Sequence, residues 1–220
     1  MKYERDVGRI YQLSFEAVKR ECRLEDLPHE IAVVLARIVH ACGMPDIVDD
    51  LRYTPNFAVR GRRALDDGAV VLCDTRMTAT GIMRRQMPPD AVVSTLIDDP
   101  KATSAAARKG ITRSAAAVEL WQDMLDGAVA VIGNAPTALF RLLEIMDETG
   151  IRPALIIGFP VGFVGAMESK AELERDPRGA EYITLRGRRG GSGMAAAAVN
   201  ALCRLPSHAT GQPGGDHAHA

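Results

Sequence analysis

Short apolar runs alternate with longer segments of helical spacing from residue 69 to about residue 202. The runs AVVLCD, AVVSTLID, AVAVIG and PALIIGF are rich in β-branched side chains, and each is followed by a helical segment. Continuous apolar runs of this kind are typical of parallel strands that are covered on both faces. We therefore predict an α/β fold with a mostly parallel central sheet and helices on both faces.

Two helices are predicted in front of these strands. Residues 3–24 and residues 27–43 both carry apolar side chains at helical spacing. Pro28 suits the first turn of the second helix and Gly43 suits its end. The fold should therefore begin with an N-terminal helical segment.

The C-terminal third adds two more elements and a tail. Residues 181–187, EYITLRG, are predicted to form a further edge strand, and the small residues of 191–205 a closing helix. From Pro206 the sequence is polar and rich in glycine. We expect residues 1–205 to form a single domain and residues 206–220 to be a disordered tail.

Composition argues against several classes of binding partner and against a metal or disulfide scaffold. The chain has 220 residues, and 27 Lys and Arg nearly balance 28 Asp and Glu, so net charge indicates neither a nucleic-acid nor a membrane partner. The N-terminus lacks an apolar signal region, and no run of 18 apolar residues occurs. The four cysteines are scattered without a CxxC pair, which argues against a zinc site and a disulfide scaffold. We expect a cytoplasmic protein.

The loops after the predicted strands are the places to look for a ligand site. They are rich in glycine, hydroxyl-bearing residues, asparagine and arginine, and the helix N-termini that they open suit carboxylate or phosphate groups. IGNAPTA (132–138) follows a strand and opens a helix, but it lacks the G-x-G-x-x-G spacing of a dinucleotide site. A nucleotide-dependent α/β enzyme remains an alternative.

His40 is the histidine most open to a functional role. The other four lie at the start of a helix (His29) or in the tail (His208, His217, His219). At about 100° per residue, His40 falls opposite the apolar stripe of its helix, which argues against a core position. It could stabilise the C-terminal end of the helix dipole, or it could exchange a proton. Spacing alone leaves both open.

The neighbours of His40 argue against a metal site and against a pairing of His40 with a cysteine nucleophile. No second His or Cys stands at metal-ligand spacing, so a metal site is not predicted. Cys42 is two residues away, and on a helix such side chains point apart. Arg37 lies on the same side, so it could address the same ligand as His40.

Arginines are frequent in the predicted loops. Most would be solvated surface residues, but Arg76 follows a strand end and Arg113 opens a helix. At such positions a guanidinium can hold a carboxylate through two hydrogen bonds. A ligand with several carboxylates would explain this distribution.

Six blocks then add a family resemblance. They occur in the order VHACGMPDI, DTRMTATGI, GITRSAAA, AVIGNAPTALFRLLE, GFPVGFVGAMESK and RGGSGMAAAAVNAL. Together they resemble the precorrin-8X methylmutase family of cobalamin biosynthesis from about residue 4 to residue 205. The resemblance implies an isomerase that moves a methyl group from C11 to C12 of precorrin-8X, giving hydrogenobyrinic acid, or cobyrinic acid from the cobalt form. It implies no cofactor and no external methyl donor.

The resemblance also implies site residues and a partner. His40 matches the proton donor and acceptor of the family, and Ser14 and Arg37 match substrate contacts. Motif positions with less defined substrate-binding roles are Thr75, Arg76, Thr78 and Arg113. The family implies a homodimer with sites near the subunit interface. A non-catalytic tetrapyrrole carrier is the other alternative, because binding residues alone do not distinguish it from an enzyme.

Overall fold

Six strands form one sheet in the computed structural model, which describes residue 1 and residues 3–207. The strand order is β1-β6-β5-β4-β2-β3, and all neighbouring strands are parallel except β1 and β6. The predicted fold class is therefore confirmed. From residue 208 onward the predicted tail lies outside the described residues. The strands are β1 (Leu51–Tyr53), β2 (Val70–Cys73), β3 (Val92–Ser94), β4 (Val129–Ile132), β5 (Leu155–Gly158) and β6 (Glu181–Leu185).

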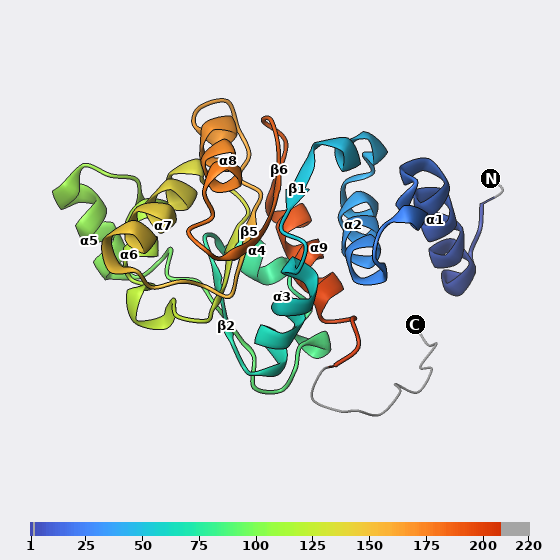
Figure 1. Cartoon of the computed structure of the whole chain (residues 1–220), viewed down its shortest axis with the longest axis horizontal. Coiled ribbons are helices and arrows are strands. Elements are labelled where there is room, and N and C mark those ends of the chain that lie inside the picture. Colours follow the sequence, from blue (N-terminus) through green and yellow to red (C-terminus); the bar gives the residue numbers. More distant parts are fainter. Residues whose placement is uncertain (2, 208–220) are drawn as a thin grey trace.

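Helices cover both faces of the sheet (Figure 1). Alternate residues of each strand point to opposite faces, so on β4 Val131 belongs to the core cluster that includes α2 and α9, whereas Ile132 belongs to the cluster that includes α7. The helices are α1 (Val7–Cys22), α2 (His29–Cys42), α3 (Phe57–Asp66), α4 (Arg76–Gly81), α5 (Pro100–Lys109), α6 (Arg113–Glu119), α7 (Pro136–Thr149), α8 (Ala166–Arg175) and α9 (Ser192–Leu202). Short 3₁₀ turns are η1 (Leu24–Asp26), η2 (Pro45–Asp50), η3 (Arg84–Gln86) and η4 (Gln122–Met124).

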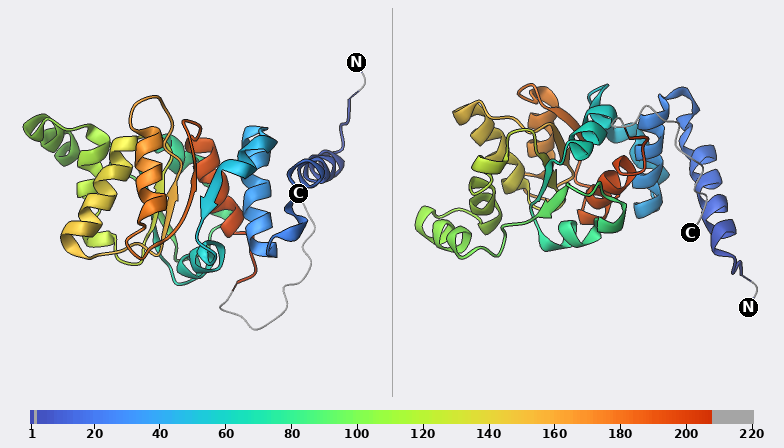
Figure 2. Two further views of the ribbon diagram at one scale, coloured as in Figure 1. Left: turned by 45° about the horizontal axis from the view of Figure 1, so that its top comes forward. Right: turned by 90° about the horizontal axis from the view of Figure 1, so that it is seen from below.

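The N-terminal helices extend the fold outward from one face. Helix α9 is almost wholly buried, α2 packs on α9, and α1 packs on α2 beyond it (Figure 2). Helix α2 begins at His29 with Pro28 as its N-cap, and it ends at Gly43 with φ 68°. This backbone conformation favours glycine, which explains the predicted helix end. His40 lies in the last turn of α2, as the spacing predicted.

One strand prediction was wrong. Residues 181–187 were expected at the sheet edge, but β6 lies between β1 and β5. The edge is β1, which pairs antiparallel with β6 through Leu51 and Leu185. The sequence pattern missed β1 because a strand of three residues carries too little alternation to be detected.

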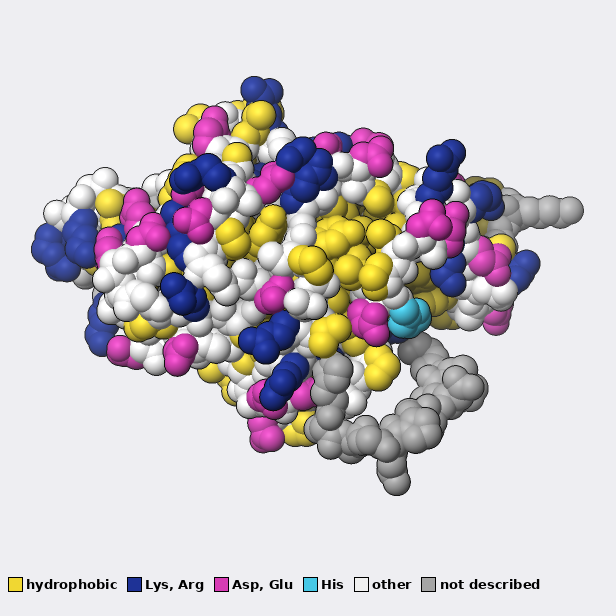
Figure 3. All heavy atoms as spheres, in the orientation of Figure 1, with side chains coloured by type: hydrophobic (Ala, Val, Ile, Leu, Met, Phe, Trp, Pro, Cys, Tyr) yellow, Lys and Arg dark blue, Asp and Glu magenta, His cyan; other side chains and the backbone are white. Residues whose placement is uncertain are grey.

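Charged and apolar side chains are unevenly distributed over the surface. Figure 3 shows Lys and Arg side chains grouped over α5, while hydrophobic side chains gather over the middle of the molecule near β1 and α2. No helix within residues 1 and 3–207 is long and apolar enough to cross a bilayer.

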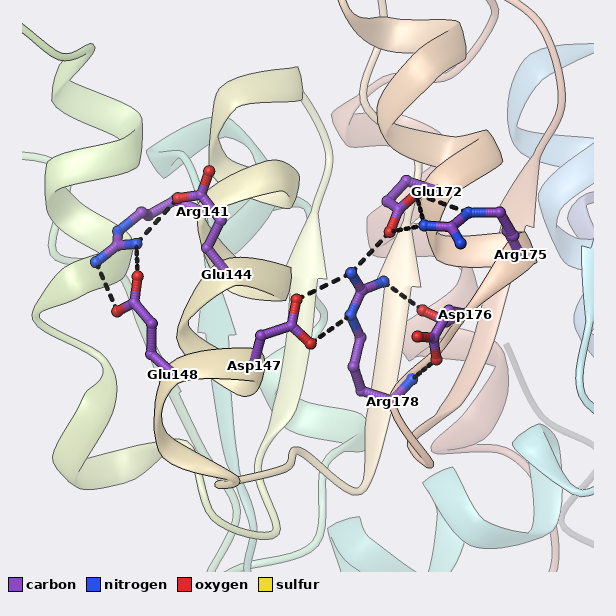
Figure 4. A network of polar contacts seen from close by, with 8 residues as sticks. All are labelled: Arg141, Glu144, Asp147, Glu148, Glu172, Arg175, Asp176 and Arg178. Carbon is purple, nitrogen blue, oxygen red and sulfur yellow. Dashed lines mark hydrogen bonds and ion pairs between the residues drawn. The ribbon is translucent and has the colours of Figure 1, made fainter.

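Two arginines connect helices on the far face of the sheet (Figure 4). Arg178 binds Asp147 of α7 at 3.0 Å and Glu172 of α8 at 2.7 Å. Arg141 of α7 binds Glu119 of α6 at 3.1 Å and Glu148 of its own helix at 2.7 Å. These arginines are occupied by carboxylates of the protein itself and so are not free for an anionic ligand.

Candidate active site

Ser14 and His40, which the resemblance implied separately as a substrate contact and a proton donor, are brought into direct contact by the packing of α1 on α2. The Oγ of Ser14 lies 2.8 Å from Nδ1 of His40, across 26 residues of sequence. Asp6 caps α1 by accepting a hydrogen bond from the backbone N–H of Arg9 at 2.6 Å, which fixes where the helix begins. Because Nδ1 is engaged by Ser14, the other ring nitrogen, Nε2, is the one left to meet a ligand.

Two aromatic rings of α1 support the histidine and its neighbouring arginine. Phe15 stacks on the His40 ring with centroids 4.9 Å apart and planes 19° apart. The Arg37 guanidinium lies 5.0 Å from the Phe15 ring centre and 5.2 Å from that of Tyr11. A cation over an aromatic face is attracted by the ring quadrupole, so the two rings hold Arg37 beside His40.

This environment makes the His40 proton easy to release. Partial burial lowers the pKa of His40 below its ordinary value, and the Arg37 charge lowers it further. The pKa of Arg37 is itself lowered, mainly by burial. An anion bound to Arg37 would offset the repulsion that the imidazolium feels.

An apolar cavity of about 650 Å³ opens beside this cluster, between α1 and α2. Tyr11, Phe15 and Arg37 line it, so the group that touches His40 also forms part of the cavity wall. Its other lining residues are Lys19, Leu24, Glu25, Leu27, His29, Ala32, Val33, Ala36 and Arg204. An apolar cavity with cationic groups suits a large apolar ring that carries carboxylates.

A second polar cluster lies at the carboxyl ends of β2 and β4. Asp74 is buried, and its carboxylate accepts the backbone N–H groups of residues 133, 134 and 135, each at 2.9 Å. Burial raises the pKa of Asp74, while these N–H groups and Thr78 oppose the rise. The carboxylate thereby ties the loop after β4 to the loop after β2.

The predicted threonines belong to this second cluster. Thr75 caps α4 by accepting the N–H of Thr78 at 3.2 Å. The Thr78 hydroxyl is fully buried and bonds Asp74 at 3.2 Å and Ser192 at 2.9 Å. Gly133 is required here, because a Cβ at that position would lie 2.5 Å from the Thr78 hydroxyl. The Thr78 hydroxyl therefore links Asp74, in the loop after β2, to Ser192 at the start of α9.

The two predicted loop arginines lie at the starts of two short helices. Arg76 opens α4 and pairs with Asp98 at 2.7 Å. Arg113 is exposed at the start of α6, with Thr112 as the N-cap. Figure 1 places α6 and the α1–α2 pair at opposite ends of the molecule. Within one chain, Arg113 and His40 thus belong to helices at opposite ends of the molecule.

Comparison with known proteins identifies the family. The family model described as precorrin-8X methylmutase matches residues 9–205. The chain belongs to the precorrin-8X methylmutase family. The resemblance found in the six sequence blocks is thereby confirmed.

Individual members of the precorrin-8X methylmutase family match over most of their length. A precorrin-8X methylmutase of Pseudomonas aeruginosa is 51% identical over 91% of this chain and 96% of its own. A cobalt-precorrin-8 methylmutase of Methanocaldococcus jannaschii is 33% identical over 82% of each chain. A solved precorrin-8X methylmutase structure from Thermus thermophilus matches with a TM-score of 0.80 at 34% identity, covering 90% of this chain and 95% of that one.

Sequence reasoning missed several residues that the fold of this family member brings to the two clusters. Tyr11 and Phe15 were used only as apolar helix positions, yet their i,i+4 spacing around Ser14 places all three beside His40. Asp74 is the last residue of the predicted strand run AVVLCD, and Ser192 follows a glycine pair at the start of the predicted closing helix. Those positions at strand and helix ends were the signal that could have found them.

Proposed function

We propose that this chain catalyses the migration of a methyl group from C11 to C12 of precorrin-8X, giving hydrogenobyrinic acid, without a cofactor. Membership of the family makes it an isomerase of cobalamin biosynthesis. The observation that carries the proposal is the contact of 2.8 Å between Ser14 and His40, because it engages Nδ1 and leaves Nε2 of a proton-exchanging side chain for a ligand.

His40 supplies the proton that the shift needs. The imidazolium donates its Nε2 proton to the ring-C nitrogen of the macrocycle, which draws electron density along the path between C11 and C12. The methyl group then migrates within the conjugated system, and the nitrogen returns the proton to His40. No atom is gained or lost over the cycle, so the reaction is an isomerisation. General acid–base catalysis of this kind contributes roughly 10²–10⁴-fold to the rate.

Ser14 and Arg37 hold the reacting groups in place. Ser14 orients the imidazole, and Arg37 binds a carboxylate arm of the substrate next to it. The macrocycle itself lies against the apolar wall of the 650 Å³ cavity. Binding the carboxylate at Arg37 also raises the proton affinity of His40, since it offsets one of the charges that lower the pKa of this residue.

We further propose that the working form is a homodimer in which the partner supplies Arg113 as a substrate contact, and that Arg76 exchanges its exposed ion pair with Asp98 for a carboxylate of the substrate. Arg113 and His40 belong to opposite ends of one chain (Figure 1), so a single chain cannot bring both to one ligand. Helix α1 carries exposed apolar side chains, among them Val7 at 72% and Ile10 at 46% exposure. Thr75 and Thr78 position the loops at the carboxyl ends of β2 and β4 around the same substrate.

We place the enzyme in the cytoplasm and favour the cobalt-free substrate. All four cysteines are free thiols, which suits a reducing compartment. The Pseudomonas relative named for precorrin-8X is 51% identical, against 33% for the Methanocaldococcus relative named for the cobalt form.

A turnover assay tests the proposal. The purified chain is incubated with precorrin-8X, and the absorption spectrum is followed while the product is assigned by the NMR position of its methyl group on C12. We expect complete conversion without added nucleotide or methyl donor. Binding of the pigment with no spectral change would instead indicate a carrier, and conversion that requires a nucleotide would contradict the cofactor-free mechanism.

A further inference from the structure

Arg204 lies next to the ring that supports Arg37. It follows α9 directly, and its guanidinium is 6.0 Å from the centre of the Tyr11 ring, while that of Arg37 is 5.2 Å from the same centre. Both arginines line the 650 Å³ cavity. Three segments that are distant in sequence thus bring two guanidinium groups to one aromatic side chain.

Neither guanidinium has a carboxylate partner among residues 1 and 3–207. Arg204 donates only its Nε, to Gln86 at 3.2 Å, so its terminal nitrogens meet no partner in the described chain. This sets the pair apart from the arginines that are bound by the protein's own acids. Those arginines include Arg62, Arg76, Arg141, Arg178, Arg186 and Arg189.

The cavity therefore carries an excess of positive charge. Lys19, Arg37 and Arg204 line it, and Glu25 is the one acidic residue of the lining within the described chain. Burial lowers the pKa of Arg37, and the nearby charge of Arg204 lowers it further. Two like charges beside an apolar wall repel each other, and an anion that binds both relieves that repulsion.

We propose that Arg204 binds a carboxylate arm of the tetrapyrrole, and that Arg37 and Arg204 together hold neighbouring arms at the mouth of the cavity. The inference rests on the proposed function, because it takes the ligand to be a polycarboxylated macrocycle. Arg204 determines affinity, whereas His40 performs the chemistry. A tetrapyrrole whose arms are esterified loses this contact.

Binding and turnover of Arg204→Ala test the assignment. Hydrogenobyrinic acid is titrated into the full-length wild type and the variant, and Kd is measured by the change in pigment absorption. Loss of a charge-assisted hydrogen bond should raise Kd about tenfold or more, while kcat at saturating precorrin-8X stays within about threefold. Arg204→Lys should recover part of the affinity. Arg20→Ala, which removes an exposed arginine of α1 paired with Glu21, is the matched control and should leave Kd unchanged.

The fully methyl-esterified ligand separates charge from packing. It should bind the wild type and Arg204→Ala with equal Kd, since neither complex contains the carboxylate contact. An unchanged Kd for the acid in Arg204→Ala, or an equal loss of affinity for acid and ester, would overturn the role of Arg204. Absence of turnover in the wild type would overturn the proposed function instead, and the titration with the acid would still measure the carboxylate contact.

Discussion

The Nδ1 atom of His40 and the Oγ atom of Ser14 are 2.8 Å apart, although they belong to different helices. Helix α1 supplies the serine and α2 the histidine, so the contact exists only when α1 is docked on α2. The bond restricts the rotation of the imidazole about its side chain and leaves Nε2 for the substrate. The proposed proton transfer by His40 therefore depends on how α1 packs on α2.

Replacing Ser14 by Ala should reduce kcat/KM about fivefold to tenfold. The change removes one hydrogen bond of roughly 1 kcal/mol, and the imidazole then samples orientations that do not reach the substrate. Gln12→Ala removes a polar side chain of the same helix, which within the described residues bonds Glu16 and Arg9 of α1. It should leave the kinetics unchanged, and equal losses in both variants would indicate a general effect on α1.

The pH dependence of kcat/KM should show how the charge of Arg37 affects the pKa of His40. His40 must be protonated to act as an acid, and its pKa lies below the ordinary value of 6.5 because of burial and Arg37. Consequently kcat/KM should fall as pH rises through a midpoint below 6.5. In the complex, a carboxylate offsets the charge of Arg37, so the midpoint for kcat should lie at higher pH.

Arg37→Gln should shift the kcat/KM midpoint upward, because the repulsive charge is gone. Steady-state assays from pH 5 to pH 8 measure both midpoints. A midpoint that stays in place or moves downward in Arg37→Gln would show that this guanidinium does not tune His40.

Asp74→Asn should lower the free energy of unfolding by about 2–4 kcal/mol. The amide nitrogen would face backbone N–H groups that the carboxylate now accepts, and buried donors left without acceptors are costly. Asp98→Asn is the comparison, since Asp98 is exposed and pairs with an exposed Arg76. Asp98→Asn should lower the free energy of unfolding by less than about 1 kcal/mol. Urea titrations measure both variants, and similar losses would contradict the buried role of Asp74.

Lys170 should make stability depend on pH in the alkaline range. It is buried, donates to the backbone oxygen of Arg189 at 2.6 Å, and burial lowers its pKa from 10.5 to about 8. Between these values the unfolded chain still holds a proton that the folded chain has released. Unfolding then takes up a proton, so folding becomes more favourable as pH rises.

The free energy of unfolding of the wild type should therefore rise relative to that of Lys170→Met. The rise should be roughly 2–3 kcal/mol from pH 7.5 to pH 10.5. Lys101→Met, which alters an exposed lysine, should show no such trend relative to wild type. A pH-independent difference for Lys170→Met would mean that the amine is not desolvated in the folded protein.

The sheet could be predicted because its inner strands are continuous apolar runs. β2, β4 and β5 appear in the sequence as AVVLCD, AVAVIG and PALIIGF, a pattern that solvent-facing strands do not show. The position of β6 could not be predicted in the same way. Its inner place depends on the pairing of Leu185 with Leu51, a contact between segments more than 130 residues apart.

The candidate site was predictable one helix at a time. The turn of 100° per residue placed His40 opposite the buried stripe of α2 and beside Arg37, and both features hold in the structure. What stacks on His40 could not be derived, because the packing angle of α1 on α2 decides that Phe15 does so. Arg62 illustrates the same limit: nothing in the run VRGRRAL distinguishes it from the neighbouring arginines, yet it is buried in α3 against Asp66.

The most direct test of the account is the conversion of precorrin-8X by His40→Ala. The variant should still fold, with the free energy of unfolding lowered by roughly 1 kcal/mol, because it loses the hydrogen bond to Ser14. It should also keep the affinity for hydrogenobyrinic acid within a few-fold, since the arginines remain. Conversion, followed by absorption, should fall by roughly 10²–10⁴-fold or below detection. Turnover at more than a tenth of the wild-type rate in a folded, ligand-binding His40→Ala would contradict proton transfer by His40.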